Sequence, residues 1–100
     1  MTTFKRRNMS IGKGDRLSSQ ADDYADGADG NSKSEIRRLR KAARLYSYAA
    51  ETYRRADMGM LAKQCFRRAA ECWYAVGEEE FCKHNELREA AIPVYWEGDE

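Results

Sequence analysis

Hydrophobic residues between positions 33 and 56 recur at alternating intervals of three and four. The series is Ile36, Leu39, Ala43, Tyr46, Ala50 and Tyr53. Residues with this spacing lie on one face of an α-helix, whereas a strand would alternate every second residue. Ser32 and Glu35 stand three residues apart at the start of the series, which is the pattern of a capping box. The sequence therefore predicts an amphipathic helix over about residues 33–56.

A second and broader apolar face follows over about residues 59–76. Its members are Met58, Leu61, Ala62, Cys65, Phe66, Ala69, Cys72, Trp73 and Val76. A face of this width can pack against more than one neighbour. Gly59 provides a short link to the preceding helix, and the small residues Ala50 and Ala62 would allow a close approach. We therefore expect the two helices to form an antiparallel hairpin.

A shorter third helix is expected over about residues 78–91. Gly77 suits the left-handed position that ends a helix, and acidic residues 78–80 favour the N-terminus of the next. Its apolar anchors are predicted to be Phe81, Leu87, Ala90 and Ala91. Pro93 prevents the helix from continuing.

The first 34 residues are rich in Gly, Ser, Asp, Asn and Lys, with few large apolar side chains. Such a segment buries too little apolar surface to offset its ordering entropy, which predicts disorder. The expected fold is all-α, with an antiparallel helical hairpin and a short third helix. It comprises a disordered arm at 1–34, a three-helix domain at 35–92 and an acidic aromatic tail at 93–100.

The charge is unevenly distributed, although 18 basic and 17 acidic residues leave a net charge of only +1. Residues 33–55 are predominantly basic and residues 78–100 predominantly acidic. A chain polarised in this way favours oriented association with charged partners, including a second copy of itself. A helical domain this small is also marginally stable alone. We therefore expect a protein partner, a homo-oligomer, or both.

The three cysteines form an odd set without a close pair. Cys65 and Cys72 lie two helical turns apart, too far to bond to each other. Together with Cys82 and His84 they do not match the spacing of a compact zinc site. Free thiols, no signal-peptide pattern and no bilayer-length apolar run indicate a cytoplasmic protein that does not enter a membrane.

The residues proposed to contact a partner form a basic band on the first predicted helix, together with two aromatic residues near the C-terminus. They are Arg37, Arg40, Lys41, Arg44, Tyr48, Tyr95 and Trp96. The band could dock on an acidic protein surface, neutralise nucleic-acid phosphates or simply remain solvated. The two C-terminal aromatic residues could anchor a partner or fold back over the open hairpin.

No catalytic, cofactor or metal site is predicted. His84 is the only histidine, and a chain of three short helices offers no evident cleft for a Cys–His pair. Gly12-Lys13-Gly14 lacks the strand and helix that flank a phosphate-binding loop. A helix-turn-helix is disfavoured because the second helix is apolar where base-reading groups belong. The protein is therefore expected not to be an enzyme.

Residues 43–76 resemble a single tetratricopeptide unit. The resemblance is carried by Tyr46, Ala49, Ala50, Tyr53, Ala62, Phe66 and Ala69, which match its small and aromatic positions. Asp57 stands where the turn glycine is usual, Tyr74 replaces the usual proline, and there is no second copy. The resemblance implies a helical hairpin that is completed by other helices or by a partner.

A looser resemblance points to small bacterial and prophage regulators of the AraC negative regulator (ANR) and PerC-like types. It is carried by Tyr53-Arg54-Arg55, Ala62 with Phe66, Phe81-Cys82, and the Arg-Arg-Ala-Ala-x-x-Trp phrase at residues 67–73. The terminal Arg-x-x-Phe-Cys phrase is absent. This resemblance implies a non-enzymatic modulator that binds a transcription factor or nucleoid protein. Alternatives are a phage inhibitor of a host defence or repair complex, and a small nucleic-acid-binding protein.

Overall fold

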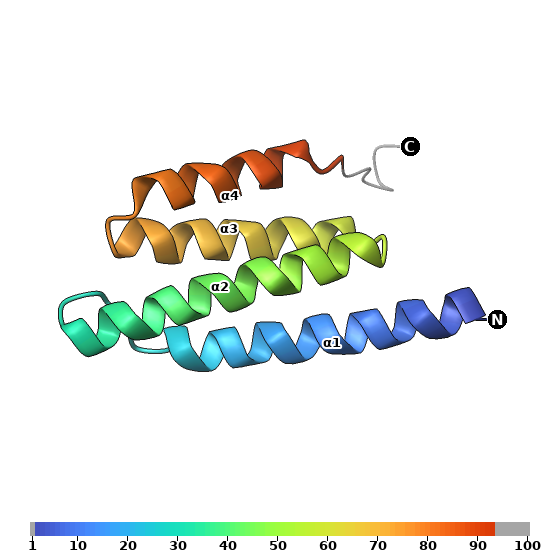
Figure 1. Ribbon diagram of the computed structural model, residues 1–100, viewed down its shortest axis with the longest axis horizontal. Helices are drawn as coiled ribbons and strands as arrows, with labels where there is room; N and C mark the ends of the chain where they lie inside the picture. The colour runs from blue at the N-terminus through green and yellow to red at the C-terminus, as the bar shows by residue number, and fades with distance from the viewer. Residues whose placement is uncertain (1, 94–100) are drawn as a thin grey trace.

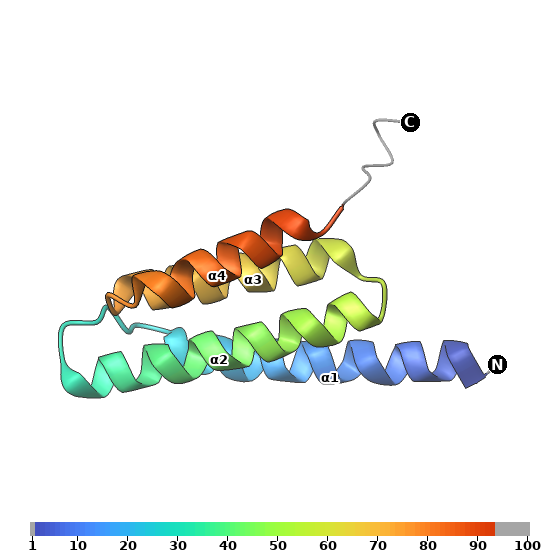
Figure 2. The same ribbon diagram turned by 45° about the horizontal axis from the view of Figure 1, so that its top comes forward.

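The computed structural model describes the backbone of residues 2–93 and the side chains of residues 12–93. This part of the chain contains four α-helices and no strand: α1 Thr2–Ala25, α2 Lys33–Arg55, α3 Gly59–Ala75 and α4 Glu79–Ala91. Consecutive helices run antiparallel, and each lies beside the next along the row (Figures 1 and 2). The prediction of an all-α fold is confirmed, and the helices α2 to α4 begin and end within one residue of the expected ranges.

The N-terminal segment differs most from expectation. The prediction of a disordered arm over residues 1–34 is wrong for residues 12–25, which belong to α1 and pack along α2. Gly14 and Ala21 are buried there, and Leu17 and Tyr24 are half-buried. A segment of this composition cannot bury enough apolar surface by itself to become ordered. A helix that packs on an existing hairpin can become ordered with fewer apolar residues of its own, because each of them is buried against apolar surface of the hairpin.

The helix α2 starts with a variant of the expected cap. The Ser32 side-chain oxygen accepts a hydrogen bond from the Glu35 amide at 3.2 Å. In a capping box the glutamate carboxylate would bind the amide of the cap residue itself. Here the Glu35 carboxylate instead accepts from the Asn31 amide, one residue earlier, at 3.2 Å. The cap still satisfies two amides at the helix entrance.

The core lies mainly between α2 and α3. One apolar cluster joins Ala49, Ala50 and Tyr53 of α2 to Ala62, Cys65 and Phe66 of α3. Ala50 and Ala62 are completely buried, which confirms that small residues lie where the hairpin closes. A second cluster farther along the hairpin includes Leu39 and Tyr46 of α2 and Trp73 of α3.

The turns on either side of α3 have the same hydrogen-bonding pattern. The Met58 amide donates to the Tyr53 carbonyl at 2.9 Å, and the Glu78 amide donates to the Trp73 carbonyl at 2.9 Å. The residue that adopts the left-handed conformation is Asp57 (φ 61°) in the first turn and Gly77 (φ 80°) in the second. This is the usual way for a chain to leave a helix. Gly77 has the predicted role, whereas Gly59 is the first residue of α3 rather than the turn residue.

The helix α4 is oriented differently from expectation. The predicted anchors Phe81, Leu87, Ala90 and Ala91 are exposed, whereas Cys82, Asn85 and Ile92 are buried. Cys82 and Asn85 lie three residues apart and therefore share one face of α4, and Ile92 follows as its extended C-cap residue. Lys63 of α3 secures the end of the helix, because its Nζ donates to the Glu89 carbonyl at 2.8 Å and the Ile92 carbonyl at 3.2 Å.

Candidate protein-interaction surface

The predicted basic band lies along the outward side of α2. Arg37, Arg40, Lys41, Arg44 and Tyr48 are all exposed. Their positions follow from the helical period, since residues three, four and seven apart lie on the same side of a helix. The opposite side of α2 carries Leu39, Tyr46 and Tyr53, which are buried.

Three of these residues meet residues from later in the chain around one surface hollow. Arg40, Arg44 and Tyr48 line a hollow of about 420 Å³ together with Trp73, Glu78 and Phe81. The Phe81 ring packs on Trp73, with ring centroids 4.7 Å apart. Tyr48 is 60% exposed and Phe81 is 51% exposed. The hollow therefore has aromatic walls and a basic edge; sequence reasoning identified its α2 residues but not Trp73 or Phe81.

A polar contact holds the middle of α4 beside α2, and Phe81 lies one helical turn earlier, at the hollow. Asn85 is 4% exposed, and its side-chain oxygen accepts a hydrogen bond from the Ser47 hydroxyl at 2.9 Å. Its side-chain nitrogen donates to the Phe81 carbonyl at 2.8 Å. Because both ends of the amide are satisfied, its burial carries little desolvation cost.

The charges on this face are mixed but predominantly positive. Arg40 forms an ion pair with Glu78 at 3.2 Å, and Arg88 of α4 lies 3.6 Å from Glu51. Partial burial alone would raise the pKa of Glu51, but the hydrogen bond from Arg54 and the nearby arginine charges lower it on balance. Glu51 therefore remains ionised and offsets part of the basic charge.

Two other predicted contact residues, Lys41 and Arg37, do not line the hollow. Lys41 extends toward α1, where its Nζ lies 5.1 Å from the centroid of the Tyr24 ring. Arg37 is exposed near the start of α2 and does not line the hollow. Tyr95 and Trp96 lie outside the described residues, so their predicted contact role stays a prediction.

A second set of contacts, between α1 and the hairpin, was not anticipated. The Tyr46 hydroxyl donates a hydrogen bond to Asp22, and the Tyr53 hydroxyl donates to Asp15. Arg68 of α3 also reaches Asp22, at 3.2 Å. Burial, together with the hydrogen bond to a carboxylate, raises the pKa of both tyrosines well above its usual value. The hydroxyls therefore remain protonated donors at neutral pH.

A sequence signal for these contacts was present. Gly14-Asp15-x-Leu17 returns seven residues later as Ala21-Asp22-x-Tyr24, and Tyr46 and Tyr53 are also seven residues apart. Two antiparallel helices with matching seven-residue steps can place each aspartate beside one tyrosine. Counting apolar residues alone missed this pattern, because the repeated positions are small or acidic.

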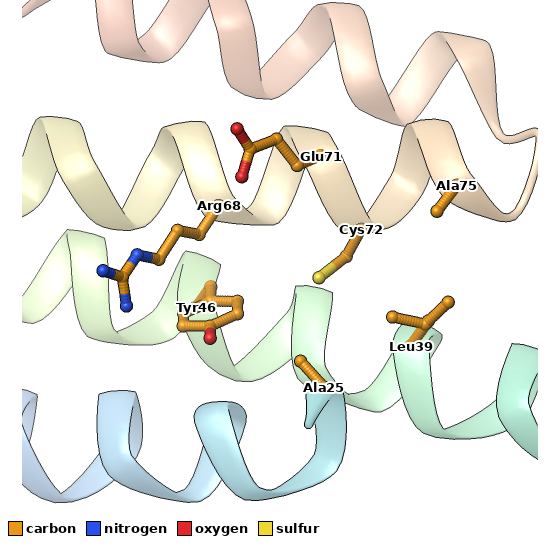
Figure 3. A pocket seen from close by; sticks show the side chains of 7 residues that line it. All are labelled: Ala25, Leu39, Tyr46, Arg68, Glu71, Cys72 and Ala75. Atoms are coloured by element: carbon orange, nitrogen blue, oxygen red, sulfur yellow. The ribbon is translucent and has the colours of Figure 1, made fainter. Parts of the chain in front are cut away.

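A further hollow, of about 320 Å³, opens between α2 and α3 beside the C-terminal end of α1 (Figure 3). It is lined by Ala25, Leu39, Tyr46, Arg68, Glu71, Cys72 and Ala75. The Cys72 thiol points from α3 toward the neighbouring helices (Figure 3). Burial, with a smaller effect from Glu71, raises the pKa of this thiol to about 11. Cys72 is therefore an unreactive apolar lining group rather than a nucleophile.

Cys65, Cys72 and Cys82 are free, as predicted, and all three are buried. Within residues 12–93, no group of three or more histidine, cysteine or acidic side chains is arranged to hold a metal ion. Across the described helices, none is both long and apolar enough to span a bilayer.

Comparisons with known proteins do not place the chain in a family. No family model, no curated protein and no solved structure matches it. Any function must therefore be inferred from the surfaces described above.

Proposed function

We propose that the protein is a non-enzymatic regulator that binds an acidic segment of a partner protein through the outward face of α2 and the start of α4. The observation that carries this proposal is the hollow of about 420 Å³ shared by Arg40, Arg44 and Tyr48 with Trp73 and Phe81. Exposed aromatic residues beside arginines are typical of the residues that dominate binding energy at protein interfaces. A partner segment with one apolar side chain flanked by carboxylates would pack that side chain against the aromatic residues and pair its carboxylates with the arginines of this hollow.

The charge pattern favours a protein partner over nucleic acid. Arg40 is already paired with Glu78, and Glu51 lies on the same face beside Arg88. Acidic groups within a phosphate-binding surface would repel the backbone that they face. A protein segment can position its own charges to match a mixed surface.

The two resemblances support different parts of the proposal. Tyr46, Tyr53, Ala62, Phe66 and Ala69 are buried where α2 meets α3, which supports treating this hairpin as tetratricopeptide-like. Tyr53, Ala62 and Phe66 also carry the resemblance to ANR and PerC-like regulators. Because these residues are in the core, this resemblance supports a similar hairpin fold more than it supports a particular partner. A bacterial transcription factor or nucleoid protein remains the proposed class of partner.

The test is co-purification of partners from a bacterial lysate with two variants of the face and two matched controls. Arg44→Glu and Tyr48→Ala change the hollow. Arg16→Glu changes an exposed arginine on α1, and Tyr74→Ala an exposed aromatic residue on α3. We expect the two face variants to lose one specific protein that both controls retain.

The same experiment separates a protein partner from nucleic acid. Nuclease treatment of the lysate should leave the captured protein in place. If nuclease removes it, or if the chain binds DNA with an affinity that falls steeply with salt, the nucleic-acid alternative is correct. If the face variants capture the same proteins as the wild type, the proposal is wrong.

A further inference from the structure

The surface of α2 and α3 beneath α1 has the properties of a helix-binding groove. Its polar contacts are arranged along its length: Tyr53 binds Asp15, while Tyr46 and Arg68 bind Asp22. A buried small residue of α1, Gly14 or Ala21, stands directly before each of these aspartates. An added Cβ at Gly14 would fall 2.7 Å from the Tyr53 ring, so the groove requires a residue without a side chain there.

These contacts define what the groove recognises. Each aspartate follows a buried small residue and precedes, by two positions, a half-buried larger one: Gly14-Asp15-x-Leu17 and Ala21-Asp22-x-Tyr24. The small residue allows close approach, the aspartate accepts the tyrosine hydrogen bond, and the larger residue lies against the flank. A helix that carries this step twice, seven residues apart, therefore fits the groove.

The chain's own helix fills the groove incompletely. Ala25 is the last residue of α1, and it lines the hollow of about 320 Å³ between α2 and α3 (Figure 3). Leu39 and Cys72 give that hollow apolar walls. A helix with a larger apolar residue three positions after its second aspartate would fill space that Ala25 leaves open. Such a helix would bury more apolar surface than α1 does.

We infer that this groove is a second interaction site, distinct from the proposed α2–α4 face, which binds a helix of a partner protein in place of α1. The partner helix carries the small–Asp–x–apolar step twice, seven residues apart, with a large apolar residue at the position of Ala25. The helix α1 is the intramolecular competitor for this site. The partner can bind only chains in which α1 has left the groove. Any change that favours release of α1 therefore raises the apparent affinity for the partner helix.

The test uses the full chain and a labelled peptide with the sequence of residues 12–28 as the probe. The chain is prepared as wild type, as Gly14→Ala, as Asp15→Asn with Asp22→Asn, and as the control Gly12→Ala. An added Cβ at Gly12 meets no atom within 4 Å. The Gly14→Ala chain and the Asp15→Asn with Asp22→Asn chain, here called the loosened chains, hold their own α1 less tightly. We expect both to bind the peptide roughly ten-fold or more tightly than the Gly12→Ala chain, because their own α1 competes less well.

Two altered peptides test the recognition pattern itself. A peptide with Ala25→Leu should bind roughly three-fold or more tightly than the native peptide, because leucine fills the hollow. A peptide with Asp15→Asn and Asp22→Asn should bind roughly ten-fold or more weakly, because both charged hydrogen-bond acceptors are lost. Equal binding of the acidic and amide peptides would overturn the inference.

Further outcomes would also overturn it. No peptide uptake by either loosened chain, with helical content and cooperative unfolding retained, would show that the groove does not accept a helix in trans. Loss of cooperative unfolding in both loosened chains would show that α1 cannot leave the hairpin. A doubled molar mass that excess peptide does not reverse would assign the groove to a second copy.

Discussion

The two interfaces made by α2 are built from different interactions. The helices α2 and α3 contain seven buried residues each, including Phe66 and Trp73, and the two apolar clusters of the core join these two helices. By contrast, the one buried side chain contributed by residues 12–25 of α1 is that of Ala21, Leu17 and Tyr24 are only half-buried, and two tyrosine–aspartate hydrogen bonds join α1 to α2. Apolar burial supplies most of the stability of a fold, whereas hydrogen bonds select position and partner. The hairpin is therefore the stable unit, and α1 is an attached element of lower stability.

The largest expected effect comes from the hairpin. Phe66 is 1% exposed and is the largest fully buried side chain in the described part of the chain. Phe66→Ala should lower the free energy of unfolding by about 3–5 kcal/mol, measured by urea denaturation followed by circular dichroism. Tyr74→Ala on the same helix, where Tyr74 is exposed, should change it by less than about 0.5 kcal/mol. Similar losses in both variants would contradict the description of the core.

An intermediate effect is expected where α1 meets the hairpin. Gly14→Ala brings a Cβ within 2.7 Å of the Tyr53 ring, and such overpacking costs about 1–3 kcal/mol. We expect the loss to appear as faster proteolysis of residues 12–31 while α2 and α3 remain protected. Gly12→Ala is the matched control and should slow cleavage, because alanine favours a helix over glycine by about 1 kcal/mol. Equal rates of proteolysis at residues 12–31 in the Gly14→Ala and Gly12→Ala variants would argue against close packing of Gly14 on Tyr53.

Alkaline pH should weaken the α1 contacts before it unfolds the hairpin. The pKa values of Tyr46 and Tyr53 are raised above the ordinary value of 10, first by burial and then by the aspartate hydrogen bonds. The folded state therefore holds these protons more tightly than the unfolded chain does. The stability that they contribute is complete below pH 10 and falls above it, by up to about 1.4 kcal/mol per tyrosine per pH unit.

The measurement is tyrosine absorbance together with proteolysis of α1 between pH 9 and 12. The double variant Tyr46→Phe and Tyr53→Phe should lack this alkaline release. The pKa of Cys72, raised by burial from 9.0 to about 11, leaves a separate loss of stability between those two pH values. Release of α1 at the same pH in the wild type and in the double variant would exclude the tyrosines as its cause.

The smallest effect is expected from one hydroxyl. Tyr53→Phe removes the hydrogen bond to Asp15 but keeps the ring. Asp15 is exposed and can bind water instead, so we expect a loss of only about 0.5–1.5 kcal/mol, confined to α1. Amide exchange rates of residues 14–25 would rise while those of α3 stay unchanged. A loss that spreads to α3 would show that the hydroxyl supports the core itself.

The sequence predicted the hairpin well because its signals are apolar and periodic. Leu39, Tyr46 and Tyr53 repeat every seven residues on one face of α2, and Gly77 occupies the left-handed position expected of it. The basic side of α2 was found by the same reasoning. Phe81 was missed as a lining residue because its approach to α2 depends on how α4 is oriented, and Trp73 was expected only as part of the apolar face of α3.

The errors arose where packing depends on polar or small residues. The arm at 1–34 was expected to be disordered, yet Gly14, Ala21, Asp15 and Asp22 place α1 on the hairpin. The anchors of α4 were chosen for their apolar character, whereas Asn85 is buried through two hydrogen bonds. Polar contacts of this kind depend on the partner helix and cannot be read from one segment alone.

Residue-resolved hydrogen exchange on the full chain tests the central claim most directly. The two-interface account predicts the slowest exchange for amides of residues 62–73 in α3, at the rate of global unfolding. It predicts clear protection for residues 14–25 of α1, with an opening free energy lower by about 1 kcal/mol or more. Unprotected amides in residues 14–25, or exchange of α1 and α3 at one common rate, would contradict it.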